Sequence, residues 1–354
     1  MARNPNIKKM KLHDFSYSLP DELIAQHPRE KRDQSRMLFL DRQKGSFLDF
    51  SFFQFPDFLC EGDVLVVNDS RVIPARLFGK KPTGGTVEIL LLAPQRTDRQ
   101  SELWEVLLRP AKRLREKDII RLEENGEAKI VQRLSEKKWL VEFITPVNFD
   151  GYLERFGKTP LPPYIKRPKN GDDDSVDRER YQTVYARKPG SVAAPTAGLH
   201  FTENILETLK TRGVSIAAVT LHVGYGTFLP IETEDVERHA MESEYYEISQ
   251  ESSRIINGAK RVIAVGTTST RAIESATDTD GCVRPQEGWT RLFIYPGYSF
   301  KRVNGLLTNF HLPRSSLFLL VCAFAGTDLT RKAYAHAVEE RYLFYSYGDC
   351  MLIL

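Results

Sequence analysis

Three of the seven histidines lie in short stretches rich in glycine, threonine and asparagine, residue types that often surround a bound ligand. They are His200 in 192–202, His222 in 221–230 and His311 in 307–313. An imidazole titrates near neutral pH, so these side chains could carry protons in a reaction. A metal site is the alternative, but no two of these histidines have chelate spacing. We therefore predict acid–base chemistry without a metal.

Each histidine also has a structural interpretation, because a lone histidine beside apolar residues is often a hydrogen-bonded core or cap residue. His200 could orient a helix expected from residue 203, and His311 could brace a turn that contains proline. His222 ends an expected strand and precedes a glycine-rich loop. It is the preferred acid or base of the three.

The same stretches, with a fourth at 264–271, could hold a ligand. Small residues let backbone amides approach a ligand closely, and threonine hydroxyls add donors. Gly224-x-Gly226 lacks the third glycine and the downstream acid of a dinucleotide fingerprint, and no Walker lysine follows a glycine-rich loop. The spacing therefore excludes the two common phosphate-loop motifs.

Two polar groups elsewhere have both a functional and a structural interpretation. Asn68-Asp69-Ser70-Arg71 closes an apolar strand and could bind a ligand, or form an Asx turn. Glu242 and Glu244 follow His239 and could offer carboxylates to a cation, or belong to a solvated helix end.

The elements that must position these residues fall into two groups. Closely spaced β-branched runs with turn residues between them favour an antiparallel barrel or sandwich. These runs are 64–67, 72–78, 86–92, 103–108, 118–122, 128–134 and 138–144. No segment with helical periodicity interrupts them.

After residue 200 helices and strands alternate, which indicates an α/β layer. We expect helices at 203–213 (capped by Thr202 and Gly213), 250–259, 271–276, 315–325 and 329–344, strands at 214–223, 261–265 and 291–295, and a turn at 266–270. The predicted fold is a mixed-sheet α/β domain, residues 1–68 and 151–354, with an antiparallel β-barrel inserted at 69–150. Reactive loops gather at the carboxyl ends of strands, so the three histidines should converge on one pocket.

Composition places few limits on function. The net charge is +3 and the four cysteines lie far apart, which suits a reducing, cytoplasmic compartment. The longest apolar run, 317–325, is too short to span a bilayer.

Basic residues gather in the expected barrel: Arg71, Arg76, Lys80 and Lys81, then six Lys/Arg against two acids from Arg109 to Arg121. Such clusters attract a polyanion, although solvated hairpin charges explain them equally well.

With these stretches assembled, the chain resembles the S-adenosylmethionine:tRNA ribosyltransferase-isomerase family of queuosine biosynthesis over nearly its whole length. The matching stretches are LPDELIAQHP (19–28), NDSRVIPARLFGKK (68–81), LPPYIKR (161–167), YQTVYARKPGSVAAPTAGLHFT (181–202), VTLHVGYGTFLP (219–230), AVGTTSTR (264–271), FIYPGY (293–298), LLTNFHLPRSS (306–316) and SYGDCM (346–351). The resemblance implies transfer and isomerisation of the ribosyl group of S-adenosylmethionine onto a 7-aminomethyl-7-deazaguanine of tRNA, with loss of adenine and methionine. It also implies an α/β domain with an inserted barrel.

Under this resemblance we assign acid and base work to His222 and His200, with His311 in support. Substrate binding is assigned to Asn68, Asp69, Arg71, Thr196, Gly198, Gly224, Gly226, Thr227, Thr267, Thr268 and Asn309. Contacts to tRNA are assigned to Arg76, Lys80, Lys81, Arg113 and Arg115. S-adenosylmethionine is consumed as a substrate, no cofactor or metal is required, and we expect a monomer.

The sequence departs from the family's usual pattern at three positions. Glu242 stands where a second histidine is common, Asn304 where an acid is usual, and Tyr225 where alanine is common. We therefore leave Glu242 out of the catalytic set. Two competing functions are an S-adenosylmethionine-dependent methyltransferase, which lacks support from a glycine fingerprint, and a non-catalytic RNA-binding barrel.

Overall fold

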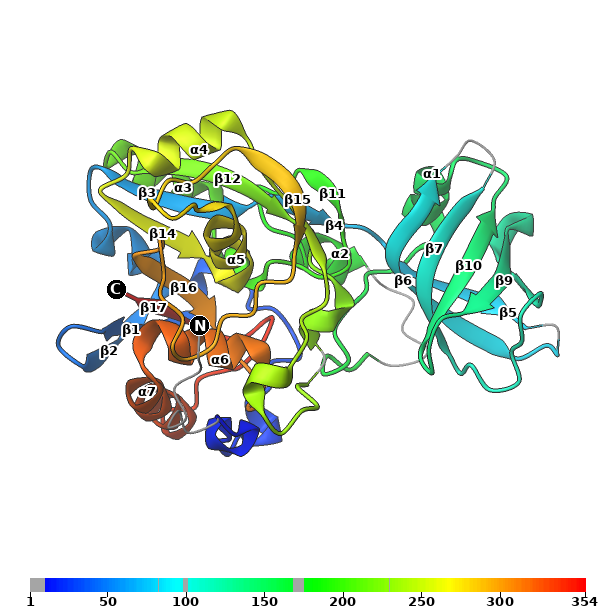
Figure 1. The fold of residues 1–354 in the computed structure, drawn as a ribbon, viewed down its shortest axis with the longest axis horizontal. Coiled ribbons are helices and arrows are strands. Elements are labelled where there is room, and N and C mark those ends of the chain that lie inside the picture. Colours follow the sequence, from blue (N-terminus) through cyan, green and yellow to red (C-terminus); the bar gives the residue numbers. More distant parts are fainter. Residues whose placement is uncertain (1–9, 82, 98–100, 168–174, 229) are drawn as a thin grey trace, which may run out of the picture.

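The computed structural model describes residues 10–81, 83–97, 101–167, 175–228 and 230–354. They form two bodies, an α/β body and a smaller barrel beside it (Figure 1). Short 3-10 helices lie at Leu12–Phe15, Asp21–Leu23, Arg32–Gln34, Phe52–Phe58 (η4), Glu123–Asn125, Thr196–His200 (η6), Tyr225–Phe228 (η7) and Val236–Arg238.

A nine-stranded mixed sheet forms the centre of the α/β body, in the order β15-β13-β12-β3-β14-β16-β17-β1-β2. Its strands are β1 (Arg36–Asp41), β2 (Ser46–Ser51), β3 (Asp63–Asn68), β12 (Ser215–Leu221), β13 (Glu244–Ile248), β14 (Arg261–Val265), β15 (Gln286–Thr290), β16 (Gly305–Asn309) and β17 (Cys350–Ile353). β12 and β14 flank β3 on opposite sides, and all three run parallel. Later strands are therefore added on both sides of β3, which makes this position a switch point in the strand order. Ligands commonly bind at such a point in sheets of this kind.

Helices cover both faces of this sheet because the central strands are apolar on both sides. Val64 and Val66 of β3 pack into one core with α4 (Gln250–Asn257), α5 (Gly266–Ala276), α6 (Ser316–Ala325) and α7 (Thr327–Glu339). Leu65 and Val67 pack into the other with α3 (Glu203–Thr211) and η4. Helix α3 begins after the N-cap Thr202 and is followed by Gly213 at φ +79°, as the sequence predicts.

The barrel is closed and antiparallel, which confirms the predicted fold class. Its order is β10-β7-β6-β5-β8-β9. The strands are β5 (Arg76–Lys80), β6 (Thr86–Thr97), β7 (Glu102–Arg109), β8 (Ile119–Arg121), β9 (Glu127–Arg133) and β10 (Lys138–Ile144). Helix α1 (Phe149–Phe156) packs on its core. The remaining described elements are a parallel pair of strands, β4 (Ser70–Val72) and β11 (Lys188–Ser191), and the helix α2 (Ser175–Arg180). The proposed division at residues 68 and 150 stays a prediction.

Three predicted elements were wrong. The run 72–78 is broken between β4 and β5, where Pro74 cannot donate to a ladder. The turn expected at 266–270 is the start of α5, and the Ser269 and Thr270 hydroxyls donate to the carbonyls of residues 265 and 266 there. Residues 291–295 pack on the core without forming a strand, and β15 precedes them.

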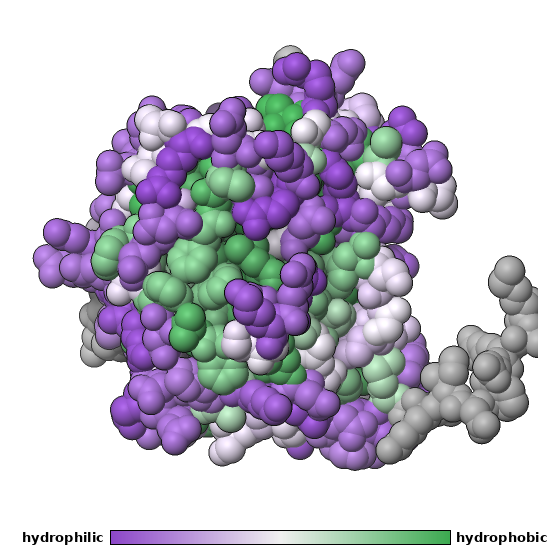
Figure 2. Space-filling view, turned by 90° about the vertical axis from the view of Figure 1, so that its left-hand side faces the viewer, coloured by the Kyte–Doolittle hydropathy of each residue, from purple (hydrophilic) through white to green (hydrophobic). Residues whose placement is uncertain are grey.

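The described surface has one area where hydrophobic side chains gather. No helix in the described part of the chain combines the length and apolar character needed to cross a bilayer. All four cysteines are free. Figure 2 shows the end of the α/β body that lies away from the barrel, where hydrophobic side chains gather within a hydrophilic surround. The expected monomer stays a prediction.

A buried carboxylate holds the segment that leads into β16. Glu274 of α5 is 1% exposed and accepts from the backbone N–H groups of Lys301, Arg302 and Val303, and from the Tyr298 hydroxyl. The end of β16 lines the cavity described below. By holding the segment before β16, this carboxylate therefore helps to position that part of the cavity wall.

We predict that Glu274→Leu destabilises the protein by about 3 kcal/mol, because buried N–H groups lose their acceptor. Urea unfolding would measure this change. The matched control is Glu207→Leu, since Glu207 is 67% exposed and bonds only Lys210, and it should cost less than about 0.5 kcal/mol. Equal effects of the two variants would contradict the assigned role.

Candidate active site

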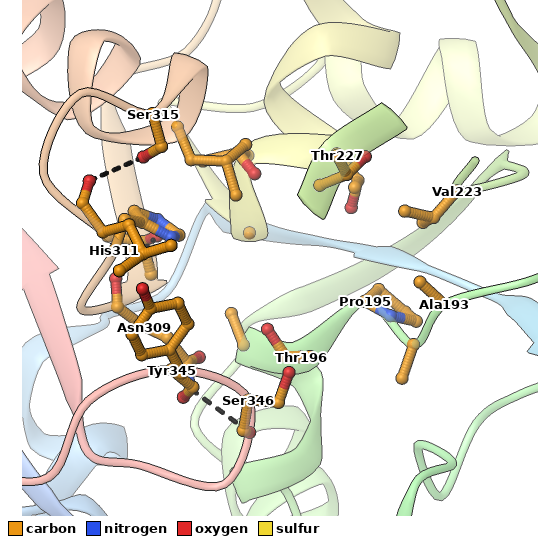
Figure 3. Close-up of a pocket in the computed structure, with 18 of the residues that line it drawn as sticks. Ala193, Pro195, Thr196, Val223, Thr227, Asn309, His311, Ser315, Tyr345 and Ser346 are labelled. Carbon is orange, nitrogen blue, oxygen red and sulfur yellow. Dashed lines mark hydrogen bonds between the residues drawn. The ribbon is translucent and has the colours of Figure 1, made fainter. Parts of the chain in front are cut away.

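A cavity opens at the carboxyl ends of β12, β14 and β16, and about 820 Å³ of space not filled by protein atoms, part of it open solvent, lies within and at the mouth of it (Figure 3). Its walls come from segments far apart in the sequence: Tyr164, 193–197, Val223, Thr227, Pro230, 266–268, 308–309, 311–313, Ser315, Leu317, Tyr345 and Ser346. The wall carries no carboxylate, ammonium or guanidinium group in the part of the chain that the structure describes. It is therefore a mostly neutral site with a few hydroxyl, amide and imidazole groups.

His311 is the one predicted histidine that lines this cavity. It follows β16 directly, and its backbone N–H donates to the Tyr334 hydroxyl at 3.1 Å. Its Nε2 lies 2.7 Å from Thr308 Oγ1, whereas the carbonyl of Asn309 lies 3.3 Å from the same hydroxyl. The Thr308 hydroxyl can donate to Nε2 or to that carbonyl, and donation to Nε2 places the ring hydrogen on Nδ1. Burial lowers the pKa of His311 to about 3, so the ring is neutral at pH 7.

Two buried polar atoms in the cavity wall have no partner among the described residues. They are Thr268 Oγ1 and the Tyr345 hydroxyl. Leaving such a group unsatisfied costs about 1–3 kcal/mol. Asn309 is held in place, since its Nδ2 donates to the Tyr345 carbonyl at 2.8 Å. The two unpartnered hydroxyls are suited to bind a polar ligand that enters the cavity.

The first turn of α5 supplies backbone donors to the same cavity. Gly266 adopts φ +85°, which lets the chain turn from β14 directly into the helix. Thr267 and Thr268 follow and line the cavity. The first N–H groups of a helix have no partner within it, so this end favours acceptor or anionic groups of a ligand.

Glu244 holds the opposite wall; the sequence marked it as a carboxylate that could serve a cation or belong to a solvated helix end, and it was not assigned to the site. It lies in β13, not in a solvated helix end, and is 4% exposed. It accepts from the Gly224 N–H at 2.9 Å and the Thr227 hydroxyl at 3.2 Å, and it contacts Arg271 of α5. The alternation in Glu-Tyr-Tyr-Glu-Ile was the available signal, since Glu244 shares the inward face with Tyr246.

His200 lies behind the cavity rather than in its wall. Its Nδ1 contacts Ser35 Oγ at 2.7 Å, and its ring packs 5.2 Å from that of Phe52. Burial lowers its pKa to about 4. It lines a separate, small cavity with Arg32 and Arg180. The side chain therefore lies outside the main cavity but interacts with Asn309, which lines it.

His222 faces away from the cavity, so the expected convergence of the three histidines was wrong. Val223 lines the cavity, and side chains of an extended chain alternate, so His222 points to the other side. Its Nδ1 lies 2.9 Å from Ser70 Oγ, and its ring stacks on Tyr245. Burial lowers its pKa.

The predicted substrate-binding residues divide in the same way. Thr196, Thr227, Thr267, Thr268 and Asn309 line the cavity. The others contact residues of the same chain instead. Asn68 bonds both backbone groups of Leu221, Asp69 bonds Thr220 and Arg187, and Arg71 pairs with Glu154. Gly198 packs on Tyr185, the Gly224 N–H donates to Glu244, and Gly226 packs against Glu242. Asn68 and Asp69 thus form a strand-end turn, which was the structural alternative.

The predicted tRNA contacts lie on the barrel surface. Lys80, Arg113 and Arg115 are exposed. Arg76 bonds Glu88 and the Leu161 carbonyl, and Lys81 bonds the carbonyls of residues 110 and 112. No group of three metal-ligating side chains occurs within the described ranges.

A model of the queuosine biosynthesis protein family matches residues 12–353. The S-adenosylmethionine:tRNA ribosyltransferase-isomerase of Syntrophus aciditrophicus is 57% identical over 361 residues, covering 98% of this chain and all of that protein. The chain belongs to the queuosine biosynthesis protein family. The protein of the same name from Acetivibrio thermocellus is 50% identical over 351 residues, covering 97% of this chain and 100% of that one.

A crystal structure in the family also resembles the chain. The S-adenosylmethionine tRNA ribosyltransferase of Thermotoga maritima is 34% identical, with a TM-score of 0.54, and the match covers 96% of this chain and 100% of that one. The family assignment drawn from the sequence motifs is thereby confirmed.

The buried imidazoles make a prediction about acid stability. The pKa values of His200 and His311, about 4 and about 3, lie below the ordinary 6.5, so the unfolded chain takes up protons first. The free energy of unfolding should therefore be flat above about pH 7. It should fall as the pH drops from about 6.5 towards 4, by up to about 1.4 kcal/mol per pH unit for each histidine. Urea titrations between pH 7 and 5 test this, and His311→Gln should reduce the slope.

Proposed function

We propose that this member of the queuosine biosynthesis protein family is an S-adenosylmethionine:tRNA ribosyltransferase-isomerase. It transfers and isomerises the ribosyl moiety of S-adenosylmethionine onto 7-aminomethyl-7-deazaguanine at the tRNA wobble position, giving epoxyqueuosine and releasing adenine and methionine. The observation that carries this proposal is the 57% identity, over nearly the whole of both chains, to a relative of that name.

The cavity suits the sulfonium-bearing donor. Its unpartnered Thr268 and Tyr345 hydroxyls and the Asn309 side chain can bond a purine or a ribose, and the α5 N-terminus can bond the carboxylate of the methionine part. The donor is consumed, so it acts as a substrate rather than a resident cofactor.

His311 is the best placed of the three histidines to assist the chemistry. The departing adenine gains electron density as its bond to the ribose breaks, and a fixed N–H donor stabilises that charge. Donation from the Thr308 hydroxyl to Nε2 leaves Nδ1–H available to a ligand in the cavity. A pKa of about 3 keeps the imidazole neutral, and this suits hydrogen-bond donation better than complete proton uptake.

Two departures from the family pattern have structural explanations here. Glu242 forms an ion pair with Lys138 of the barrel at 2.5 Å. Asn304 accepts from the Val262 N–H at 2.8 Å and so supports the entry to β14. Neither residue lines the cavity, so the proposed reaction does not depend on a histidine or an acid at these positions.

The decisive experiment mixes the purified chain with S-adenosylmethionine and tRNA that carries the aminomethyl precursor. Release of free adenine is the expected result. Release of S-adenosylhomocysteine would instead indicate methylation, and RNA binding without donor consumption would indicate a non-catalytic barrel protein.

We predict that His311→Ala lowers kcat for adenine release by roughly 10²- to 10³-fold, because a preorganised donor is lost. His311→Asn, which keeps an N–H donor, should recover part of the rate. His13→Ala is the control, since that side chain is 75% exposed and lies outside the cavity. An unchanged kcat for His311→Ala at saturating donor and RNA would refute the role.

The barrel cations make a separate prediction. If Arg113 and Arg115 contact tRNA phosphates, changing both to Gln should reduce the slope of log affinity against log salt by about 2. Binding titrations from low to high salt measure that slope. An identical slope in the variant and the unmodified chain would place the RNA backbone elsewhere.

A further inference from the structure

Three ring side chains form a continuous surface on the outer side of β12, β13 and β15. The His222 and Tyr245 rings are stacked, with centroids 5.6 Å apart and an interplanar angle of 20°. Trp289, the register partner of Tyr245, meets it edge-on at 5.8 Å. Trp289 is 64% exposed, the largest exposed fraction among the described large hydrophobic side chains. We call these three residues the outer aromatic patch.

A chain of hydroxyls fixes the tautomer of His222 in this patch. The Val223 N–H donates to Ser191 Oγ at 2.8 Å, and Ser191 Oγ contacts Ser70 Oγ, which lies 2.9 Å from His222 Nδ1. Every hydroxyl hydrogen finds an acceptor only if Ser191 donates to Ser70 and Ser70 donates to Nδ1. The ring hydrogen of the neutral imidazole then lies on Nε2.

Gly190 packs against this edge of the His222 ring. A Cβ built on Gly190 would lie 2.8 Å from both Nε2 and Cε1, so a side chain at this position would press on the ring. Gly190 also lines a cleft shared with barrel residues that include Trp104 and Phe149. β11 and β15 lie on the side of the α/β body that faces the barrel (Figure 1). The patch therefore borders the junction of the two bodies.

We propose that the outer aromatic patch binds an unpaired nucleobase of the RNA substrate, stacked on Trp289 and Tyr245 and hydrogen-bonded by His222 Nε2–H. This inference rests on the proposed function. The bound base belongs to a nucleotide that flanks the modified one, because Val223 lines the donor cavity whereas His222 faces the opposite side. The reacting base and its neighbour would thus be held on two sides of one chain segment.

The local charges favour recognition of a base over recognition of a phosphate. Lys188 is paired with Glu247 at 2.5 Å, and the Tyr245 hydroxyl donates to Glu287 at 2.7 Å. These groups carry one net negative charge (+1 − 2), which disfavours a phosphate. Stacking on an exposed aromatic ring needs no net positive charge and is worth about 1–3 kcal/mol per base.

Two measurements test the patch directly. Trp289→Ala should raise both the Kd for a precursor-containing anticodon stem-loop and its KM by roughly 5- to 100-fold, with kcat at saturation and donor affinity unchanged. Phe53→Ala is the matched control, since Phe53 is 61% exposed and lies outside the patch, and it should bind the stem-loop like the unmodified chain. Tyr245→Leu should weaken binding in the same direction.

Fluorescence gives a readout that needs no variant. Trp104 and Trp139 are only 9% and 3% exposed, so the emission of Trp289 should respond most strongly to bound RNA. The stem-loop should quench its emission, and a fully paired duplex of equal length should not. Equal Kd and KM for Trp289→Ala and Phe53→Ala would overturn the patch while leaving adenine release intact. An unmodified chain that releases no adenine, yet binds RNA through Trp289, would overturn the proposed function alone.

Discussion

The contact between Glu244 and Arg271 inside the α/β body is the interaction on which the cavity depends. Both side chains are 4% exposed, and the carboxylate also holds Gly224 and Thr227 of one wall, while Arg271 belongs to the helix that forms another. Removing one partner would leave a buried charge uncompensated, which typically costs about 3–5 kcal/mol. The two walls are therefore fixed relative to each other before any ligand binds.

Among the described residues, the cavity wall that this frame encloses has no formally charged group, and that neutrality suits the donor proposed above. A sulfonium donor is already positive, so a nearby ammonium or guanidinium would repel it. Burial serves the same end by keeping His311 uncharged, and Thr308 orients the ring. The site then offers dipoles and hydrogen-bond donors in fixed positions, which is how an enzyme stabilises charge that appears only during the reaction.

The barrel is tied to the loop that carries Thr227. Arg109 donates to the Tyr225 hydroxyl at 2.9 Å, and Lys138 pairs with Glu242, whose carboxylate packs against Gly226. An RNA held between barrel and α/β body would thus lie beside the donor cavity. This arrangement explains how one chain can present a large polyanion and a small donor to the same place.

The sequence by itself determined the elements whose signals are local. Closely spaced β-branched runs separated by turn residues predicted the barrel strands, and the caps Thr202 and Gly213 marked the ends of α3. Glycine- and threonine-rich stretches located most of the cavity wall, because strand ends are where small polar residues gather. Only the tertiary structure decided that His222 faces outward and Glu244 inward. A change of one position reverses the direction of an extended side chain, and pairing across the sheet is set by contacts between residues far apart in the chain.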